Sequence, residues 1–266
     1  MGWLGDRPGG SLTVPLELTY LGCEGVLVRG RAGSVLIDGL FSNEAAPFGI
    51  PDAGVLETLR RARPPFDSVD VILATHHHAD HFDAGAVATY LGANPRTRFV
   101  STSQAVAELR AATGDAFAGR IHALAATEGV VDGVDVGDIR VDGFGLSHGK
   151  VHYAGVEHLG LLVTLDGRRV LHLGDGIIAE KSLRSAGVID AAIDVGVVPF
   201  WFLTHPFGRR LAERGFRPRV SFAVHIRVTE REQVVREVEQ WPNAVAFTEP
   251  LSRFDVADDG TVTRKE

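Results

Sequence analysis

The sequence has almost no cysteine, no long apolar run and no block of basic residues, and each absence excludes a class of protein. Its one cysteine, Cys23, can form no intramolecular disulfide, so the chain is not a disulfide-stabilised secreted scaffold. No apolar run reaches the length of about 20 residues that a membrane-spanning helix needs. Residues 1–7 lack the basic and apolar regions of a signal peptide. We therefore expect a cytoplasmic protein with no membrane partner, in which Cys23 is a small core residue.

The charge balance argues against nucleic acid as a partner. In the 266 residues, Asp and Glu number 34 and Lys and Arg number 27, which gives a formal net charge of −7. Proteins that bind nucleic acid usually carry a basic patch or stripe, and this sequence has no run rich in Lys and Arg. We expect a small-molecule substrate and no nucleic acid, and the sequence specifies no oligomeric state.

Short runs of β-forming residues, each ended by Gly, Asp or Pro, dominate the sequence. These runs predict strands at Leu16–Leu21, Val26–Arg29, Ser34–Ile37, Val69–Ala74, Arg98–Ser101, Ile121–Leu124, Ile139–Leu146, Gly160–Leu165, Val170–Leu173, Ala192–Val198, Val220–Val224, Arg253–Val256 and Thr261–Thr263. Helical spacing and capping patterns predict helices at Val55–Ala62, Asp83–Leu91, Ser103–Ala112 and Thr229–Trp241. Strands in groups with helices between them favour a layered α/β fold, and the absence of a linker favours one domain over residues 1–266.

A histidine-rich run is the first sign of chemistry. His76 and His78 follow the apolar strand Val69–Ala74 and are two residues apart, so in extended chain they point to the same side. Asp80 and His81 come next, just before a predicted helix. Imidazole and carboxylate are ligands that zinc and similar divalent ions prefer. His77 lies between the pair and is expected to point away from it.

Three more residues of ligand type stand just beyond the ends of apolar runs. His148 follows the strand at 139–146, Asp175 follows the strand at 170–173, and His225 follows the strand at 220–224. In layered α/β folds, functional sites collect at such strand ends. The alternative is a solvated loop rich in histidine or an adventitious metal site, but four independent runs that end in ligand-type residues favour a built metal site.

The order of these seven residues resembles the metallo-β-lactamase superfamily, over nearly the whole chain. Val35–Gly39 and the long loop before the histidines also resemble this family. The resemblance extends to the branch of hydrolases similar to ascorbate-6-phosphate lactonase, on the residues around Leu171–Asp175 and Asp194–Pro199. It implies a four-layer αββα sandwich with two divalent ions at one edge, zinc first, with manganese or iron as alternatives.

The resemblance also implies a role for each ligand candidate. By position, His76, His78 and His148 hold one ion, Asp80, His81 and His225 hold the other, and Asp175 bridges the two. A hydroxide held by two ions would then cleave a small, anionic ester, lactone or phosphodiester, with Asp80 and Asp175 as catalytic carboxylates. An iron-dependent oxidoreductase is the alternative, although some oxygen-reducing di-iron relatives place glutamate where this chain has His78. A non-catalytic metal-binding protein is the third hypothesis.

Other residues are candidates for supporting or substrate-binding roles. Ser147 or Asp38 is a candidate to orient a metal-bound imidazole. The sequence leaves open whether Pro199–Phe202 and Leu40–Pro51 are core or pocket wall, with Trp201 as the favoured apolar contact. Two histidines, His122 and His172, are expected in the core or behind the ligands. The loop candidates for substrate contact are His152, His158 and His205.

Overall fold

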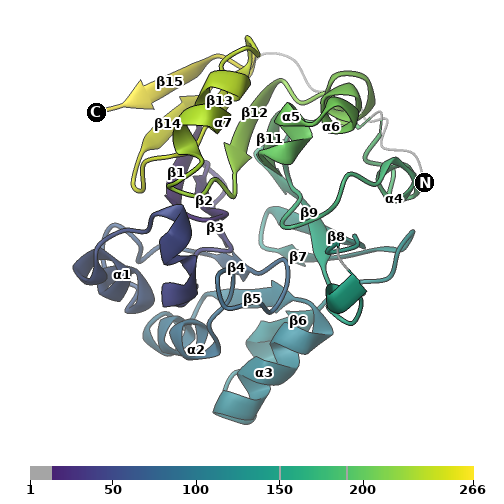
Figure 1. The fold of residues 1–266 in the computed structure, drawn as a ribbon. Coiled ribbons are helices and arrows are strands. Elements are labelled where there is room, and N and C mark those ends of the chain that lie inside the picture. Colours follow the sequence, from purple (N-terminus) through teal and green to yellow (C-terminus); the bar gives the residue numbers. More distant parts are fainter. Residues whose placement is uncertain (1–13, 150, 190) are drawn as a thin grey trace.

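The computed structural model describes residues 14–149, 151–189 and 191–266, and within them the strands form two sheets that face each other (Figure 1). Residues 1–7, in which we expected no signal peptide, lie outside the described part. None of the helices in the described ranges has both the length and the apolar character that crossing a bilayer requires.

The first sheet has the order β15-β14-β1-β2-β3-β4-β5-β6. Its strands are β1 (Leu16–Gly22), β2 (Gly25–Arg29), β3 (Ser34–Ile37), β4 (Val71–Leu73), β5 (Arg98–Ser101), β6 (Ile121–Ala123), β14 (Arg253–Val256) and β15 (Val262–Lys265). An antiparallel meander of β1, β2 and β3 gives way to parallel pairing from β3 through β6. The loops that follow β4 and β5 therefore leave from the same edge of this sheet.

The second sheet has the order β13-β12-β11-β10-β9-β8-β7. Its strands are β7 (Val131–Val136), β8 (Ile139–Gly145), β9 (Leu159–Leu165), β10 (Arg168–His172), β11 (Val195–Pro199), β12 (Val220–Val224) and β13 (Ala244–Ala246). The pairs β10–β11, β11–β12 and β12–β13 are parallel. The pairs β7–β8, β8–β9 and β9–β10 are antiparallel.

Helices cover the outer face of each sheet (Figure 1). They are α1 (Ala53–Arg60), α2 (Ala84–Ala93), α3 (Ser103–Thr113), α4 (Glu180–Ser185), α5 (Trp201–Thr204), α6 (Pro206–Leu211) and α7 (Arg231–Val238), with 3₁₀ turns at Asn43–Phe48, Ala118–Arg120 and Val151–Tyr153 and a π-helical turn at Ala212–Phe216. Helices α1, α2 and α3 lie against the first sheet, and α4 to α7 lie against the second.

Three apolar cores separate four layers. The central core lies between the sheets and contains Leu18 of β1 and Val163 of β9. A second core packs α1 and α2, through Leu59 and Val87, onto the first sheet. A third packs α4, through Leu183, onto the second sheet together with the helices that follow it. The expected four-layer αββα sandwich is therefore confirmed.

The sequence predictions locate most elements but miss those at the margins. Every predicted strand and helix has a counterpart, with ends shifted by a few residues. Strands β7 and β13 and helices α4, α5 and α6 were not predicted. In β7, valine is interrupted by Asp and Gly at an exposed sheet edge, and the other four elements are short. The sequence pattern from Thr229 to Glu232 predicts a capping box at the start of the last helix, and this prediction is wrong, because α7 begins at Arg231 and its N-cap residue Glu230 provides no side-chain cap.

Candidate metal centre

The histidine run joins two well-anchored elements. Strand β4 is buried on both faces. Helix α2 is capped by Asp83, whose side chain accepts a hydrogen bond from the amide of Ala86 at 2.7 Å. Between them the chain turns tightly, because the amides of His81 and Phe82 both donate to the carbonyl of His78. This turn brings Asp80 and His81 back beside the strand end.

His76 and His78 face one volume, and His77 faces another. The rings of His76 and His78 meet edge to face at 4.6 Å between centroids. The Nδ1 atom of His77 lies 2.6 Å from a carboxylate oxygen of Glu108 in α3, on the helix side of the sheet. The alternation expected from extended chain therefore holds at this position.

The first ligand cluster comprises His76, His78, His148 and Asp175. The Nε2 atom of His148 lies 3.1 Å from Nε2 of His76 and 3.0 Å from Nδ1 of His78. It lies 3.4 Å from Oδ2 of Asp175. Ligand atoms bonded to one tetrahedral zinc at about 2.0–2.1 Å stand about 3.3 Å apart. The spacing of this cluster therefore fits a single ion.

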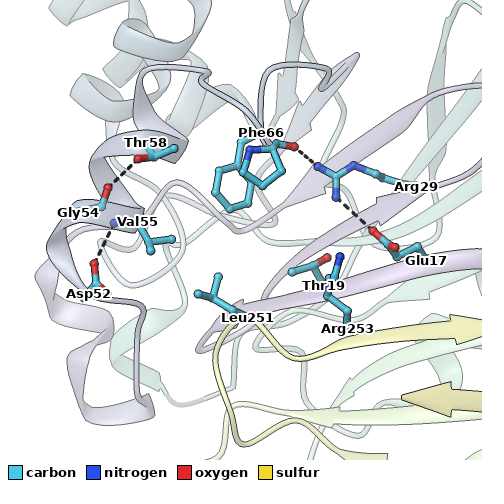
Figure 2. A pocket seen from close by; sticks show the side chains of 11 residues that line it. Glu17, Thr19, Arg29, Asp52, Gly54, Val55, Thr58, Phe66, Leu251 and Arg253 are labelled. Atoms are coloured by element: carbon cyan, nitrogen blue, oxygen red, sulfur yellow. Dashed lines mark hydrogen bonds and ion pairs between the residues drawn. The ribbon is translucent and has the colours of Figure 1, made fainter. Parts of the chain in front are cut away.

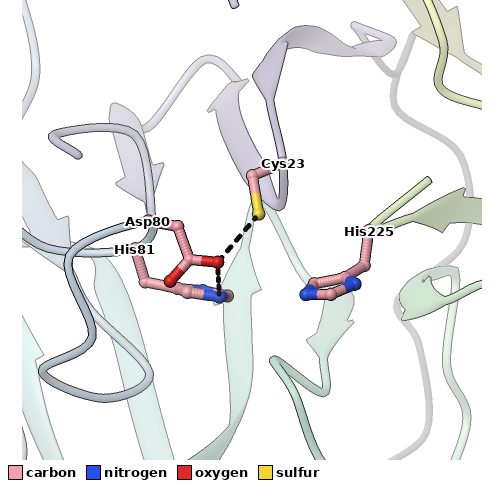
Figure 3. A group of neighbouring side chains, drawn as sticks. All are labelled: Cys23, Asp80, His81 and His225. Carbon is pink, nitrogen blue, oxygen red and sulfur yellow. Dashed lines mark hydrogen bonds and ion pairs between the residues drawn. The ribbon is translucent and has the colours of Figure 1, made fainter. Parts of the chain in front are cut away.

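The second cluster comprises Cys23, Asp80, His81 and His225, whose ligand atoms all lie within 4.8 Å of one another (Figure 3). Nε2 of His81 is 3.7 Å from Oδ2 of Asp80. Sequence analysis did not place Cys23 here. It is fully buried, as expected. The turn between β1 and β2 directs its thiol toward this cluster, although Cys23 also contacts the core.

Asp175 links the two clusters through different oxygens. Its Oδ2 faces His148, whereas its Oδ1 lies 3.3 Å from Nε2 of His81 and 3.2 Å from Nε2 of His225. Among the described residues, neither Oδ1 of Asp175 nor Nε2 of His81 has a hydrogen-bond partner, although both are buried. Buried polar atoms that approach each other without bonding point to a shared centre. The donor set therefore fits metal ions, with Asp175 between them.

The electrostatics show a site that attracts positive charge. Burial alone would raise the pKa of Asp175, but the charges of His81 and His225 hold it well below its ordinary value. Burial alone would lower the pKa of His81, but the Asp175 carboxylate raises it well above the ordinary value. Burial and the neighbouring His81 keep the pKa of His76 low. A divalent cation would replace the charge that this cluster otherwise draws from protons.

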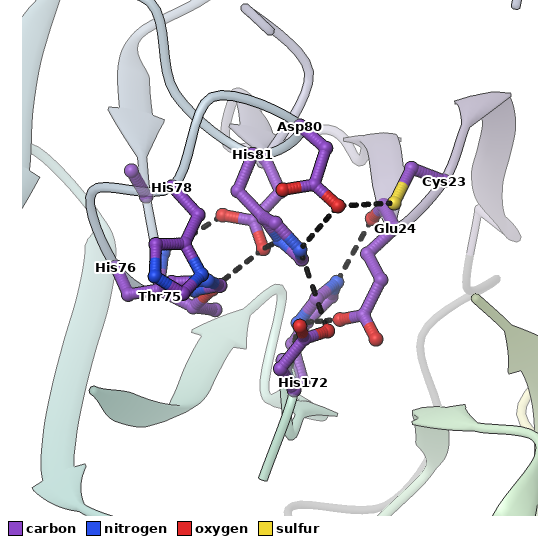
Figure 4. A network of polar contacts seen from close by, with 12 residues as sticks. Cys23, Glu24, Thr75, His76, His78, Asp80, His81 and His172 are labelled. Atoms are coloured by element: carbon purple, nitrogen blue, oxygen red, sulfur yellow. Dashed lines mark hydrogen bonds and ion pairs between the residues drawn. The ribbon is translucent and has the colours of Figure 1, made fainter. Parts of the chain in front are cut away.

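One buried carboxylate, that of Asp38, supports ligands of both clusters: it contacts His81 directly and His76 through Thr75, and Figure 4 shows these three partners in one polar network. Oδ2 of Asp38 lies 2.9 Å from Nδ1 of His81 and 2.7 Å from the hydroxyl of Thr75. That hydroxyl lies 3.0 Å from Nδ1 of His76, so each imidazole has its other nitrogen free for an ion. Burial alone would raise the pKa of Asp38, but the hydrogen bond and the charge of His81 lower it. Of the two predicted orienting residues, Asp38 has this contact, whereas Ser147 is exposed.

A second buried carboxylate escaped sequence analysis. Glu24 is fully buried, and neither of its carboxylate oxygens has a hydrogen-bond partner in the described ranges. One of them lies 3.9 Å from Nδ1 of His172, whose Nε2 is 3.0 Å from the backbone carbonyl of Glu24. Burial and the charge of Asp175 raise the pKa of Glu24 well above its ordinary value. His172 thus lies behind the ligands, as expected.

The remaining histidines differ from expectation in two cases. His122 was expected in the core or behind the ligands but is exposed on β6. His158 was expected in a substrate loop but is buried, with its ring 5.1 Å from that of His76. Behind it, a side chain at Gly174 would meet Nε2 of His158 at 2.6 Å, and Gly174 has φ +51°. This close approach lets the chain after β10 turn toward the ligands.

Aromatic side chains surround the clusters. The ring of Trp201 lies 5.2 Å from that of His225, and its Nε1 donates to the carbonyl of Gly176 at 3.1 Å. Phe48, from the ambiguous loop 40–51, lies 4.4 Å from the ring of His225. Tyr153 was not predicted, and its ring lies 4.6 Å from that of His148. No pattern in the short 3₁₀ turn that carries Tyr153 marks it for this position.

His205 occupies a different setting from Trp201. It is exposed, its Nδ1 accepts a hydrogen bond from the amide of Phe207 at 3.3 Å, and it caps the start of α6. The ring of Phe207 stacks on it at 5.7 Å. These contacts lie within its own helix, so the structure gives His205 a local role and leaves its substrate contact a prediction.

A pocket of about 590 Å³ is lined by residues outside the two clusters (Figure 2). It lies among α1, β1, β2 and β14, and its lining includes Glu17, Arg29, Val55, Phe66 and Arg253. No residue of either ligand cluster lines it. The chemistry-bearing residues are therefore at the strand ends and not in this pocket.

Comparison with known proteins identifies the family. Residues 17–199 match the model of the "Beta-lactamase superfamily domain". No curated protein matches the sequence.

Solved structures share the fold at low identity. A possible metal-dependent hydrolase from Veillonella parvula is 15% identical, with a TM-score of 0.64 over 90% of this chain and 98% of that one. Igni18, a metallo hydrolase of the archaeon Ignicoccus hospitalis, is 17% identical, with a TM-score of 0.57 over 94% and 98%. CmlA, a diiron β-hydroxylase of Streptomyces venezuelae, is 15% identical, with a TM-score of 0.55 over 97% of this chain and 55% of its own.

Identities this low show a common fold and do not transfer a substrate, but the family model covers more than half of the chain. With its two facing sheets and its ligand-type residues at their shared edge, the chain belongs to the metallo-β-lactamase superfamily.

Proposed function

We propose that this protein is a hydrolase with a dinuclear metal centre, preferably of zinc. His76, His78 and His148 hold the first ion, and Asp80, His81 and His225 hold the second. The observation that carries the proposal is the split carboxylate of Asp175, which faces His148 with one oxygen and His81 and His225 with the other. A carboxylate placed in this way has the geometry of a bridging ligand.

Two divalent ions held by these residues would supply a hydroxide at neutral pH and would stabilise charge on the attacked group. The chain contributes the rest. Asp38 and Thr75 fix the orientation of the imidazoles. Asp80, whose side chain is 22% exposed, is placed to accept a proton at the open side of the site and return it to the leaving group.

The substrate that fits is small and anionic. Two dications and two carboxylates would leave an excess of positive charge at the site, whereas the chain as a whole has a net charge of −7. Phe48, Tyr153 and Trp201 supply apolar walls close to the ligands. We propose an ester, a lactone or a phosphodiester; the lactone follows from the resemblance to the ascorbate-6-phosphate lactonase-like branch. Polymeric nucleic acid is a poor fit, because its binding needs many Lys and Arg contacts to phosphate.

An iron-dependent oxidoreductase is the competing function, since the diiron hydroxylase CmlA shares the fold. The first cluster argues for hydrolysis, because it presents three imidazoles and the one carboxylate of Asp175. We also propose a cytoplasmic location, because the one cysteine needs no oxidising compartment.

The test is metal analysis combined with a substrate panel. Protein purified without chelator should contain close to two divalent ions per chain, with zinc dominant, and should hydrolyse a member of a panel of β-lactams, thioesters, lactones and phosphodiesters. A metal content near zero after reconstitution would refute the dinuclear centre. Two iron atoms with visible absorbance and oxygen consumption would support the oxidoreductase. Cleavage of single-stranded RNA at physiological salt would overturn the small substrate.

A further inference from the structure

Cys23 is the one member of the second cluster that the family pattern did not supply. It occupies the turn between β1 and β2 and is fully buried. Its Sγ lies 3.8 Å from Oδ2 of Asp80, and Figure 3 shows the thiol directed toward that carboxylate, with His225 across the gap. Its Sγ is also within 4.8 Å of the ligand nitrogens of His81 and His225. The thiol therefore faces the space between the ligands of the second ion.

The backbone holds the thiol in this direction. Cys23 has φ +50°, a left-handed conformation that is uncommon for a residue with a side chain. Its carbonyl oxygen accepts hydrogen bonds from the amide of His225 at 3.0 Å and from the hydroxyl of Tyr20 at 3.4 Å. Strained conformations of this kind persist where surrounding contacts enforce them, and they cluster at functional sites.

A buried apolar filler is the simpler interpretation of a lone cysteine, and Cys23 does contact the core that lies under α1. That role does not explain its polar neighbours. The thiol faces the carboxylate of Asp80 and lies within 4.8 Å of the ligand nitrogens of His81 and His225. Independently, Nε2 of His81 is buried and aimed into the same space without a hydrogen-bond partner among the described residues. A cation in that space would satisfy both groups.

We propose that the Cys23 thiolate is a protein ligand of the second metal ion, beside Asp80, His81 and His225. The proposal rests on the proposed dinuclear function. A Zn–S bond of about 2.3 Å and a Zn–O bond of about 2.0 Å at a tetrahedral angle place S and O about 3.5 Å apart, close to the 3.8 Å observed. Binding forms the metal–sulfur bond and releases the thiol proton to solvent, without any redox change.

The consequence is a centre with two unlike ends. The first ion has three imidazoles and a carboxylate oxygen, whereas the second has a soft sulfur ligand in addition to its nitrogen and oxygen ligands. Thiolate favours zinc over manganese and magnesium, which prefer oxygen. The second position should therefore discriminate between metals more strongly than the first. The third negative charge, from Cys23, also lowers the net charge that the substrate meets.

The test is cobalt substitution of the full-length protein. Bound thiolate gives Co²⁺ a sulfur-to-metal charge-transfer band in the near ultraviolet, and Cys23 is the only cysteine of the chain, so the band has one source. We expect the band to grow with the second equivalent of Co²⁺ and to be absent in Cys23→Ser. The affinity of the second zinc should fall by about 10-fold or more in that variant.

A matched control is Ser147→Ala, which changes an exposed residue near His148 and should keep the band. Two bound cobalt ions without a charge-transfer band in the wild type would overturn the assignment of Cys23 while leaving the dinuclear hydrolase intact. Protein that binds no cobalt would refute the dinuclear centre and this ligand together. Because the wild-type spectrum decides the outcome, a Cys23→Ser protein that fails to fold does not remove the test.

Discussion

The backbone amide of His225 donates a hydrogen bond to the carbonyl oxygen of Cys23 at 3.0 Å. Cys23 follows β1 of the first sheet, and His225 follows β12 of the second. Both residues have positive φ, +50° and +60°. The two sheets are therefore joined at the edge that carries the ligand clusters, and the position of each of these side chains depends on the other sheet.

Replacement of Asp175, the proposed bridging carboxylate, should be the most damaging single change. We expect Asp175→Ala to reduce turnover by more than about 100-fold, which is the upper range for loss of a merely orienting partner, and to lower the metal content below two ions. His77→Ala is the matched control, because His77 bonds Glu108 on the far side of the strand. Steady-state kinetics and elemental analysis measure both. Equal losses in the two variants would contradict the opposed directions of these side chains.

Asp38→Asn should weaken metal binding, although the two side chains are nearly the same size. Asp38 accepts from Nδ1 of His81, and loss of such a partner lowers metal affinity by about 10–100-fold. A competition titration with a chromophoric chelator measures the affinity for each ion. The affinity for the second ion should change more than the affinity for the first. Thr75→Val is the comparison, because it removes the hydroxyl that contacts both His76 and Asp38 but leaves the contact between Asp38 and His81. An unchanged affinity in Asp38→Asn would show that the carboxylate does not position His81.

Trp201→Ala should raise KM by roughly 10-fold, or about 1.4 kcal/mol, with metal content unchanged. The reason is that the indole ring lies 5.2 Å from the ring of His225, a member of the second cluster. His205→Ala should raise KM less, since its contacts are with its own helix. Thermal unfolding reports the fold of each variant. Loss of folded protein in Trp201→Ala together with normal KM in Trp201→Phe would assign the ring to the core.

Alkaline pH should destabilise the protein through buried tyrosine. An unfolded tyrosine ionises near pH 10, whereas burial raises the pKa of Tyr90 to about 12. Between these values the unfolded chain releases a proton that the folded chain keeps, so the free energy of unfolding falls as pH rises from about 10 to about 12. Urea titrations at a series of pH values measure the slope. Tyr90→Phe should reduce it, and an equal slope in the variant would show that Tyr90 does not contribute.

The sequence predicts the framework of this protein better than its contacts. The seven ligand candidates each follow an apolar run, so their strand-end positions could be inferred, and the structure brings all seven into two adjoining clusters. Cys23 and Glu24 could not be placed in this way, because they lie in a hairpin turn whose direction depends on φ values and on the opposite sheet.

The residues that contact the ligand candidates could be predicted only in part. Asp38 was one of two candidates, and only the fold places its carboxylate between Thr75 and His81. Tyr153 lies in a single 3₁₀ turn without periodicity, and ring contact with His148 follows from how that turn closes over the ligand. These positions depend on long-range packing, which local pattern does not encode.

The contact of Asp38 with both His81 and Thr75 joins the two ligand clusters, so the two positions of the proposed centre should be interdependent. An ion that fixes His81 also fixes Asp38, and through Thr75 it restrains His76 on the other side. By thermodynamic reciprocity, the factor by which one ion changes the affinity for its neighbour equals the factor in the reverse direction. A metal titration of this protein should therefore not resolve into two independent isotherms, and each intrinsic affinity is defined only for a stated occupancy of the adjacent position.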